Sequence, residues 1–144
     1  MMTLYYSPMA CSLASRIALY EAEIDVTYIN ISLSSKKTET GDDYYSISPK
    51  GKVAALITAN GNLLTENAAI LTYIADVKPE KKLAPELTSK DRYKLIECLS
   101  YVGTELHKGF LFPMFASDSN NEIKEYAQMK LSQQLDYLSN QFAH

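Results

Sequence analysis

The sequence predicts an α/β domain followed by an all-helical region, on three observations. Short β-prone runs alternate with helical runs in the first half of the chain. Asn60-Gly61, set between two apolar runs, is the strongest short hairpin signal. Beyond a polar, lysine-rich, proline-bounded segment, VKPEKKLAPELTSKD, apolar residues recur only at helical spacing. These shifts predict an α/β domain at 1–77, a linker at 78–87 and a helical domain at 88–144.

The first unit is predicted to be strand, turn, helix. Residues 3–6 are β-prone, and Ser7 and Pro8 end the strand. From Ser12, the apolar positions Leu13, Ile17 and Leu19 fall at roughly helical spacing. Residues 25–31 (DVTYINI) alternate and are rich in β-branched residues, so they predict a second strand. The polar stretch 32–43 predicts a loop with a helical turn.

A hairpin and a closing helix are predicted next. The run VAALIT at 53–58 predicts a third strand, and 63–64 begin the return strand. Thr65 is expected to cap a helix at 66–77, with Glu66 in its first turn. The resulting order, β-α-β, α, β-β, α, describes a small α/β layer structure. In the second part, apolar residues mark two helices: Tyr93, Ile96, Leu99, Val102 and Leu106 in one, and Ile123, Tyr126, Ala127, Leu131, Leu135 and Leu138 in the other.

Composition excludes several classes of protein. With 144 residues, 47% of them hydrophobic, the chain can bury a core. It has only two cysteines and no signal-peptide pattern at its start, which favours a reducing cytoplasm over secretion. A net charge of −3 offers no basic surface for nucleic acid, and no apolar run approaches membrane-spanning length.

Cys11 stands where the first strand has ended and the first helix begins. Unpaired N–H groups and the positive end of the helix dipole at that point favour an anion such as a thiolate. Helix N-termini lower the pKa of cysteine and create reactive thiols. The alternative is a small buried hydrophobe, which free cysteine often is.

Four stretches in order resemble bacterial glutathione transferases of the beta class: YYSPMACSLASRIAL, KKTETGDDYYSISPKGKV, LLTENAAILTYIAD and RYKLIECLSYVGTELHKGF. Together they span most of the chain. The resemblance implies a thioredoxin-like, glutathione-binding N-terminal domain followed by an all-α transferase C-terminal domain. Members of the family continue with several more helices, so this chain is expected to hold only part of the second domain and to expose apolar helix faces.

The resemblance also implies a glutathione site. The cysteine matching Cys11 contacts the glutathione sulfur and can form a mixed disulfide with it. The matching lysine for the glycine carboxylate is Lys36, with Lys37 open as the alternative. Val53 offers its backbone to the cysteinyl residue as an added strand. Glu66 and Asn67 open a helix where N–H groups bind the γ-glutamyl carboxylate and a carboxylate pairs with the ammonium.

Ala54 departs from the family, which has a cis-proline after the position of Val53. A cis peptide before another residue costs about 2.5–4 kcal/mol, so the bond is expected either to turn trans and shift Val53 or to stay cis. Both outcomes predict weaker glutathione binding. The third alternative is a tolerated substitution with the loop held by its neighbours.

His107 and Lys108 close the motif ELHKGF at the predicted end of a helix, and both are assigned to the site by resemblance. A histidine near the sulfur can stabilise a thiolate or pass a proton. The alternative role for His107 is compensation of the helix dipole.

The leading hypothesis is a glutathione transferase of detoxification that conjugates the glutathione thiol to small electrophiles, with glutathione as co-substrate and no metal. A cytoplasmic homodimer that binds neither nucleic acid nor membrane is expected. Two alternatives stay open: glutathione-dependent thiol–disulfide exchange through Cys11, and a non-catalytic scaffold that has lost its ligand site.

Overall fold

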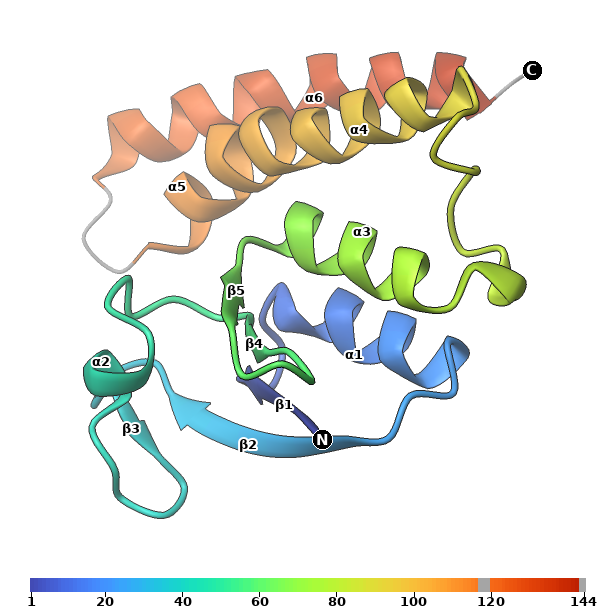
Figure 1. Ribbon diagram of the computed structural model, residues 1–144. Coiled ribbons are helices and arrows are strands. Elements are labelled where there is room, and N and C mark those ends of the chain that lie inside the picture. Colours follow the sequence, from blue (N-terminus) through green and yellow to red (C-terminus); the bar gives the residue numbers. More distant parts are fainter. Residues whose placement is uncertain (117–119, 143–144) are drawn as a thin grey trace. The chain divides into compact units, whose positions relative to one another are not determined.

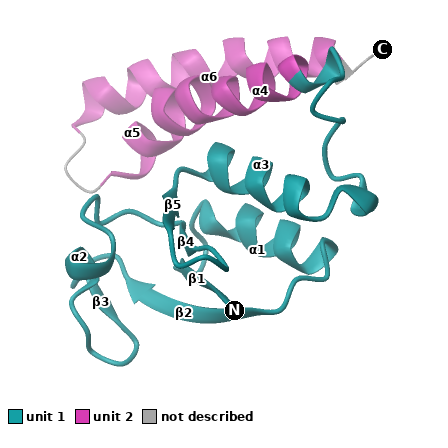
Figure 2. Ribbon diagram, viewed as in Figure 1, with its two compact units in different colours: residues 1–92 teal, residues 93–144 magenta. Residues whose placement is uncertain are grey.

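The computed structural model describes residues 1–116 and 120–142. It divides into two compact units, residues 1–92 and 93–144 (Figure 2). Residues 78–87, predicted as a linker, fall inside the first unit, where buried Arg92 donates to Asp76 Oδ2 at 2.8 Å and to the Pro85 carbonyl at 3.1 Å. The predicted domain limits stay a prediction.

The first unit follows the predicted order of elements (Figure 1). Its elements are β1 (Met2–Tyr6), α1 (Ser12–Glu21), β2 (Val26–Ser32), β3 (Lys37–Thr38), α2 (Tyr44–Ile47), β4 (Ala55–Ile57), β5 (Leu63–Thr65), α3 (Asn67–Val77) and the short 3₁₀ turn η1 (Pro79–Lys81). The two-residue strand β3 was not predicted. It lies in the polar stretch that was assigned to a loop, because pairing with β2, rather than its own composition, makes it a strand.

The five strands form one mixed sheet in the order β3-β2-β1-β4-β5. The central strand β1 runs parallel to β2, its partner across the α1 crossover, and antiparallel to β4. The hairpin predicted at Asn60-Gly61 is confirmed: β4 and β5 are antiparallel, Gly61 adopts a φ of +79°, and its N–H donates to the Thr58 carbonyl at 2.9 Å.

Alternation along the strands divides the core between the two faces of the sheet. Leu4 and Leu56 point to one face, where they pack with residues of α1 and α3, which lie side by side (Figure 1). Their neighbours Tyr5 and Ala55 point to the other face, toward buried Tyr44 of α2. The sheet is thus covered on both sides, and the strand ends that carry the site residues are fixed from two directions.

Two local predictions were wrong. Thr65 does not cap a helix: it is the last residue of β5, paired with Ala55, and Glu66 holds the N-cap position without a side-chain cap. The third strand is shorter than predicted, because only residues 55–57 pair with β1 and β5.

The second unit is helical, as predicted. Its elements are α4 (Asp91–Tyr101), whose first two residues belong to the first unit, the π-helical segment η2 (Val102–Leu111), α5 (Phe112–Phe115) and α6 (Asn121–Phe142). Helix α6 packs against η2 and α5, and the Tyr101 and Tyr137 rings lie 5.0 Å apart. Within the described ranges, no helix is long and apolar enough to cross a membrane.

Candidate functional site

Cys11 is the N-cap residue of α1, as the sequence predicted. The loop before it is held by Ser12, whose buried hydroxyl donates to the Ser7 carbonyl at 3.2 Å. The Cys11 thiol donates to the Val53 carbonyl at 3.2 Å. This hydrogen bond stabilises the protonated thiol, whereas the helix N-terminus stabilises the thiolate, so the two influences on Cys11 oppose each other.

Val53 lies at the end of a loop that leads into β4, and the peptide bond between Val53 and Ala54 is cis. The bond thus does not turn trans, which was the first alternative stated for Ala54, and the Ala54 side chain is buried in the core. The loop is tied down by Tyr44, whose hydroxyl donates to the Lys52 carbonyl at 2.8 Å. Gly51, the residue before Lys52, has a φ of +58°, in the left-handed region that favours glycine.

Replacing Tyr44 by Phe should lower the free energy of unfolding by about 1 kcal/mol, because the buried hydroxyl loses its hydrogen bond to the loop while the ring is kept. Urea denaturation followed by circular dichroism measures the loss. Tyr45→Phe is the matched control, since its ring is 49% exposed, and the expected change is within about 0.5 kcal/mol. Equal losses in the two variants would contradict this account of the loop.

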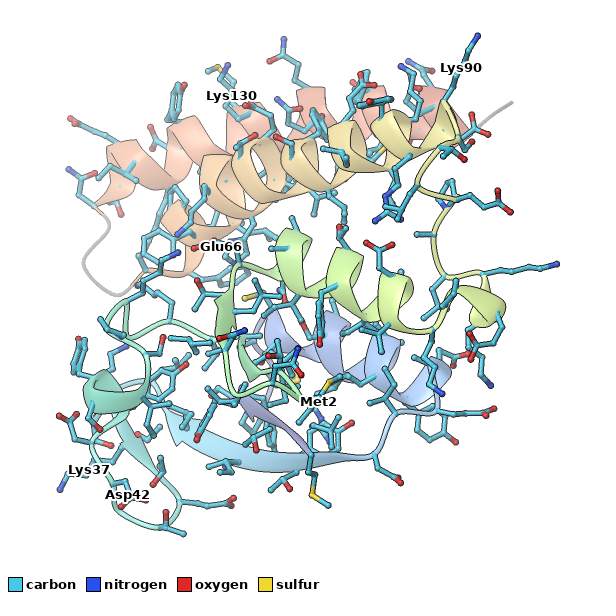
Figure 3. The ribbon with its side chains drawn as sticks, viewed as in Figure 1. Met2, Lys37, Asp42, Glu66, Lys90 and Lys130 are labelled. Atoms are coloured by element: carbon cyan, nitrogen blue, oxygen red, sulfur yellow. The ribbon has the colours of Figure 1, made fainter. Side chains whose placement is uncertain are left out.

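The two adjacent lysines are distinguished by their surroundings. Lys36 has a φ of +54°, and its ammonium donates to the Gly51 carbonyl at 2.8 Å, which places it on the loop that carries Val53. Lys37 belongs to β3, is exposed, and points away from the sheet (Figure 3). Geometry therefore favours Lys36 over Lys37 as a cation of this site.

Glu66 lies between β5 and α3, with a φ of +70° and a ψ of 121° (Figure 3). Non-glycine residues rarely adopt such a conformation, which costs roughly 1–3 kcal/mol and is concentrated at functional sites. The Glu66 carboxylate is exposed and accepts from Lys50 Nζ at 2.7 Å. A ligand ammonium can replace Lys50 there, because exposed ion pairs are weak.

Asn67 begins α3 and faces the start of α1. Its Nδ2 donates to the Cys11 carbonyl at 2.6 Å, and its Oδ1 accepts from Ser15 Oγ at 2.6 Å. The side chain is thus bound within the protein, while the first N–H groups of α3 point to where an anion is favoured. The structure brings six predicted residues together in the first unit: Cys11, Lys36, Val53, Ala54, Glu66 and Asn67.

His107 and Lys108 belong to the second unit, and both lie inside η2. The prediction that they end a helix was wrong, because helical structure continues through η2 and α5 to Phe115. His107 is therefore not placed to compensate a helix dipole. Burial lowers the pKa of His107 below its ordinary value, and the adjacent Lys108 ammonium lowers it further.

The lowered pKa of His107 predicts a loss of stability in acid. The unfolded chain binds the proton more readily than the folded protein does. The free energy of unfolding is therefore highest above the ordinary pKa of 6.5, and it falls as the pH drops through that value toward the lower pKa of the folded protein. Denaturant titrations across this range should show a steeper fall in the wild type than in His107→Gln. Identical slopes would show that the folded and unfolded chains hold the His107 proton equally.

Three residues of this site were not predicted: Ser15, Lys50 and Gly51. The tripeptide Pro49-Lys50-Gly51 carries a turn signal that could have marked the last two. Ser15 gives no such signal, because a serine inside an apolar helical run does not show what it faces. In the described part of the chain, no group of three or more His, Cys, Asp or Glu could hold a metal ion.

The sequence and the fold of this chain are similar to those of known proteins. Residues 1–76 match the family model of the glutathione S-transferase N-terminal domain. The glutathione S-transferase GstA of Escherichia coli O157:H7 is 46% identical over 138 residues, which cover 96% of this chain and 68% of that protein.

Solved structures give the same result. A sphingomonad glutathione S-transferase complexed with glutathione matches 98% of this chain and 70% of its own, with a TM-score of 0.94 and 44% identity. A beta-class glutathione S-transferase of Sphingomonas chungbukensis matches 96% of this chain and 69% of its own, with a TM-score of 0.92 and 44% identity.

Proposed function

The chain belongs to the glutathione S-transferase family, and on this premise we propose that it binds glutathione and conjugates the glutathione thiol to small electrophiles. The match of the N-terminal domain also confirms the predicted fold class. The observation that carries the proposal is the contact between the Cys11 thiol and the Val53 carbonyl at 3.2 Å. It joins a helix N-terminus to the backbone that is expected to pair with the cysteinyl residue of the tripeptide.

Groups of suitable charge for each end of glutathione lie around the contact between Cys11 and Val53. The first N–H groups of α3 suit the γ-glutamyl carboxylate, and Glu66 suits the γ-glutamyl ammonium. Lys36 suits the glycine carboxylate at the far end of the tripeptide. The solved sphingomonad relative contains glutathione, which supports the same ligand here.

Glutathione titration by calorimetry tests the proposal. Wild-type protein should bind glutathione, and Glu66→Gln should bind it up to about fivefold more weakly, because an exposed ion pair contributes up to about 1 kcal/mol. Glu86→Gln removes an exposed carboxylate between η1 and α4, beyond the other end of α3 from Glu66, and should bind like the wild type. No binding by folded wild-type protein would support the non-catalytic scaffold instead.

The second candidate function is glutathione-dependent thiol–disulfide exchange through Cys11, which lies in the first unit. In thiol–disulfide exchange, the Cys11 thiolate attacks the glutathione sulfur of a mixed disulfide, which releases the substrate thiolate. A free glutathione thiolate then attacks the Cys11–glutathione disulfide, releases oxidised glutathione and restores Cys11. Exchange without conjugation of an aryl halide would favour this function.

The wider proposal places the protein in the cytoplasm as a homodimer that meets small electrophiles. Domain limits at 1–77 and 88–144, with a linker at 78–87, belong to it as well. His107 and Lys108 are proposed as further site residues on the resemblance to the family, and His107, whose pKa is lowered, is mostly neutral near pH 7 and able to accept a proton. Light scattering on the calorimetry sample measures the oligomeric state.

A further inference from the structure

Two hydrogen bonds join the start of α1 to the start of α3 through one side chain. Asn67 donates from Nδ2 to the Cys11 carbonyl at 2.6 Å and accepts at Oδ1 from Ser15 Oγ at 2.6 Å. Ser15 lies one helical turn after Cys11 and is fully buried. The three residues form what we call the Ser15–Asn67–Cys11 bridge.

The chemistry of the bridge suits asparagine. The Cys11 carbonyl accepts from the Ala14 N–H at 3.2 Å and can accept a second hydrogen bond, which Asn67 donates, while the buried Ser15 hydroxyl requires an acceptor for its proton. The carboxamide of Asn67 provides both in one rigid plane. An apolar side chain would pack α1 against α3 without fixing any direction, whereas two short hydrogen bonds set the distance and orientation of the two helix ends.

These two helix ends are the parts of the proposed site that bind opposite parts of one ligand. The end of α1 carries the Cys11 thiol, and the end of α3 offers N–H groups for the γ-glutamyl carboxylate. A change in the distance between the starts of α1 and α3 would move Cys11 relative to the glutathione sulfur, because that sulfur is joined through the tripeptide to the γ-glutamyl group at the start of α3. The bridge also holds Cys11 where its thiol reaches the Val53 carbonyl.

We infer that Ser15 and Asn67 are positioning residues that fix Cys11 in the site, with Ser15 acting through Asn67. The inference rests on the proposed function only in taking Cys11 as the reactive thiol. It gives the Asn67 side chain a role apart from ligand binding, since both of its polar atoms are engaged within the protein.

The test measures the rate of Cys11 alkylation by iodoacetamide as a function of pH, in full-length protein carrying Cys98→Ser so that Cys11 is the single thiol. Asn67→Asp keeps the shape and the acceptor for Ser15 and loses the donor to the Cys11 carbonyl, but it also adds a negative charge that by itself raises the pKa of a nearby thiol. The neutral variant Asn67→Ala, which loses the same donor without adding a charge, is therefore the test variant. It should raise the midpoint of the pH profile by about one unit, which slows alkylation about tenfold below the midpoint. Ser15→Ala should shift the midpoint in the same direction by less.

A double-mutant comparison separates positioning from packing. If Ser15 acts through Asn67, Ser15→Ala should cause no further shift in the Asn67→Ala background. Ser15→Thr, which keeps the hydroxyl, should show the same pH profile as the protein with Ser15. Thr72→Val is the matched control, because it removes a hydroxyl of α3 that bonds only locally, to the Ala68 carbonyl at 2.8 Å, and it should leave the profile unchanged.

Unchanged profiles in Asn67→Ala and Ser15→Ala, with circular dichroism showing folded protein, would overturn the inference, and so would additive shifts in the double variant. If Asn67→Ala does not fold, the isosteric Asn67→Asp, compared with and without Ser15→Ala, gives the same decision. Because iodoacetamide replaces glutathione as the reagent, a protein that fails to bind glutathione would still report on the bridge.

Discussion

Cys11→Ala should abolish the fast formation of a mixed disulfide with oxidised glutathione. At about pH 6.5 an ordinary thiol with a pKa near 8.5 is about 1% ionised, so a thiol at a helix N-terminus should react at least about tenfold faster. Intact-mass spectrometry of samples quenched with acid over time measures the adduct. The variant should also lose most conjugation activity, since it lacks the group proposed to contact the reacting sulfur.

Cys98→Ala is the control, because Cys98 is the other cysteine of the chain and is exposed on α4. This variant should keep the fast phase, whereas Cys11→Ala should retain only slow modification at Cys98. A fast phase that survives in Cys11→Ala would show that Cys98 is the reactive thiol. A slow reaction at both thiols would mean that the hydrogen bond to the Val53 carbonyl outweighs the helix N-terminus at Cys11.

Leu4→Ala should lower the free energy of unfolding of the first unit by about 2–5 kcal/mol. Leu4 lies on the central strand, is fully buried, and packs in the cluster that joins the sheet to α1 and α3. Truncation there removes apolar contacts and leaves a cavity that two helices and the sheet surround. Urea denaturation measures the loss, provided that the slope of the transition stays unchanged.

Leu63→Ala provides a control within the same sheet. Leu63 lies on the edge strand β5 and is 39% exposed, so the same truncation should cost less than about 1 kcal/mol. Comparable losses in the two variants would show that the sheet does not depend on the cluster around Leu4. Leu4→Ala should also slow Cys11 alkylation only at denaturant concentrations where the variant has unfolded and the wild type has not, since folding positions the thiol.

The sequence predicted where Cys11, Glu66 and Asn67 stand in the fold, because each is tied to a local signal, whereas Lys36 and Val53 were assigned to the site by the resemblance alone. Cys11 stands at a strand-to-helix turn, and Glu66 and Asn67 stand where a hairpin ends and a helix begins. The engagement of the Asn67 side chain was not predictable. It depends on Ser15, 52 residues away, and no local pattern reports such a contact.

The ends of the helices in the second unit also separate what local sequence predicts from what tertiary contacts decide. Helical spacing correctly predicted helices on both sides of residue 112, but it wrongly ended one of them at His107 and Lys108. Lysine and glycine near a helix end are a common stop signal. Here packing of η2 against α5 and α6 continues the helix through Gly109, because tertiary contacts outweigh the modest cost of a glycine.

By itself, the sequence determined the order of elements, the hairpin at Asn60-Gly61 and the place of Cys11 at the start of α1, since these depend on short-range periodicity and turn chemistry. Only the tertiary structure decided which face of α1 is buried. Leu13 and Ile17, whose spacing predicted the helix, are 50% and 54% exposed, whereas Ser12 and Ser15 are fully buried. The two serines are buried because partners far along the chain or across a turn, Asn67 and Ser7, satisfy their hydroxyl groups.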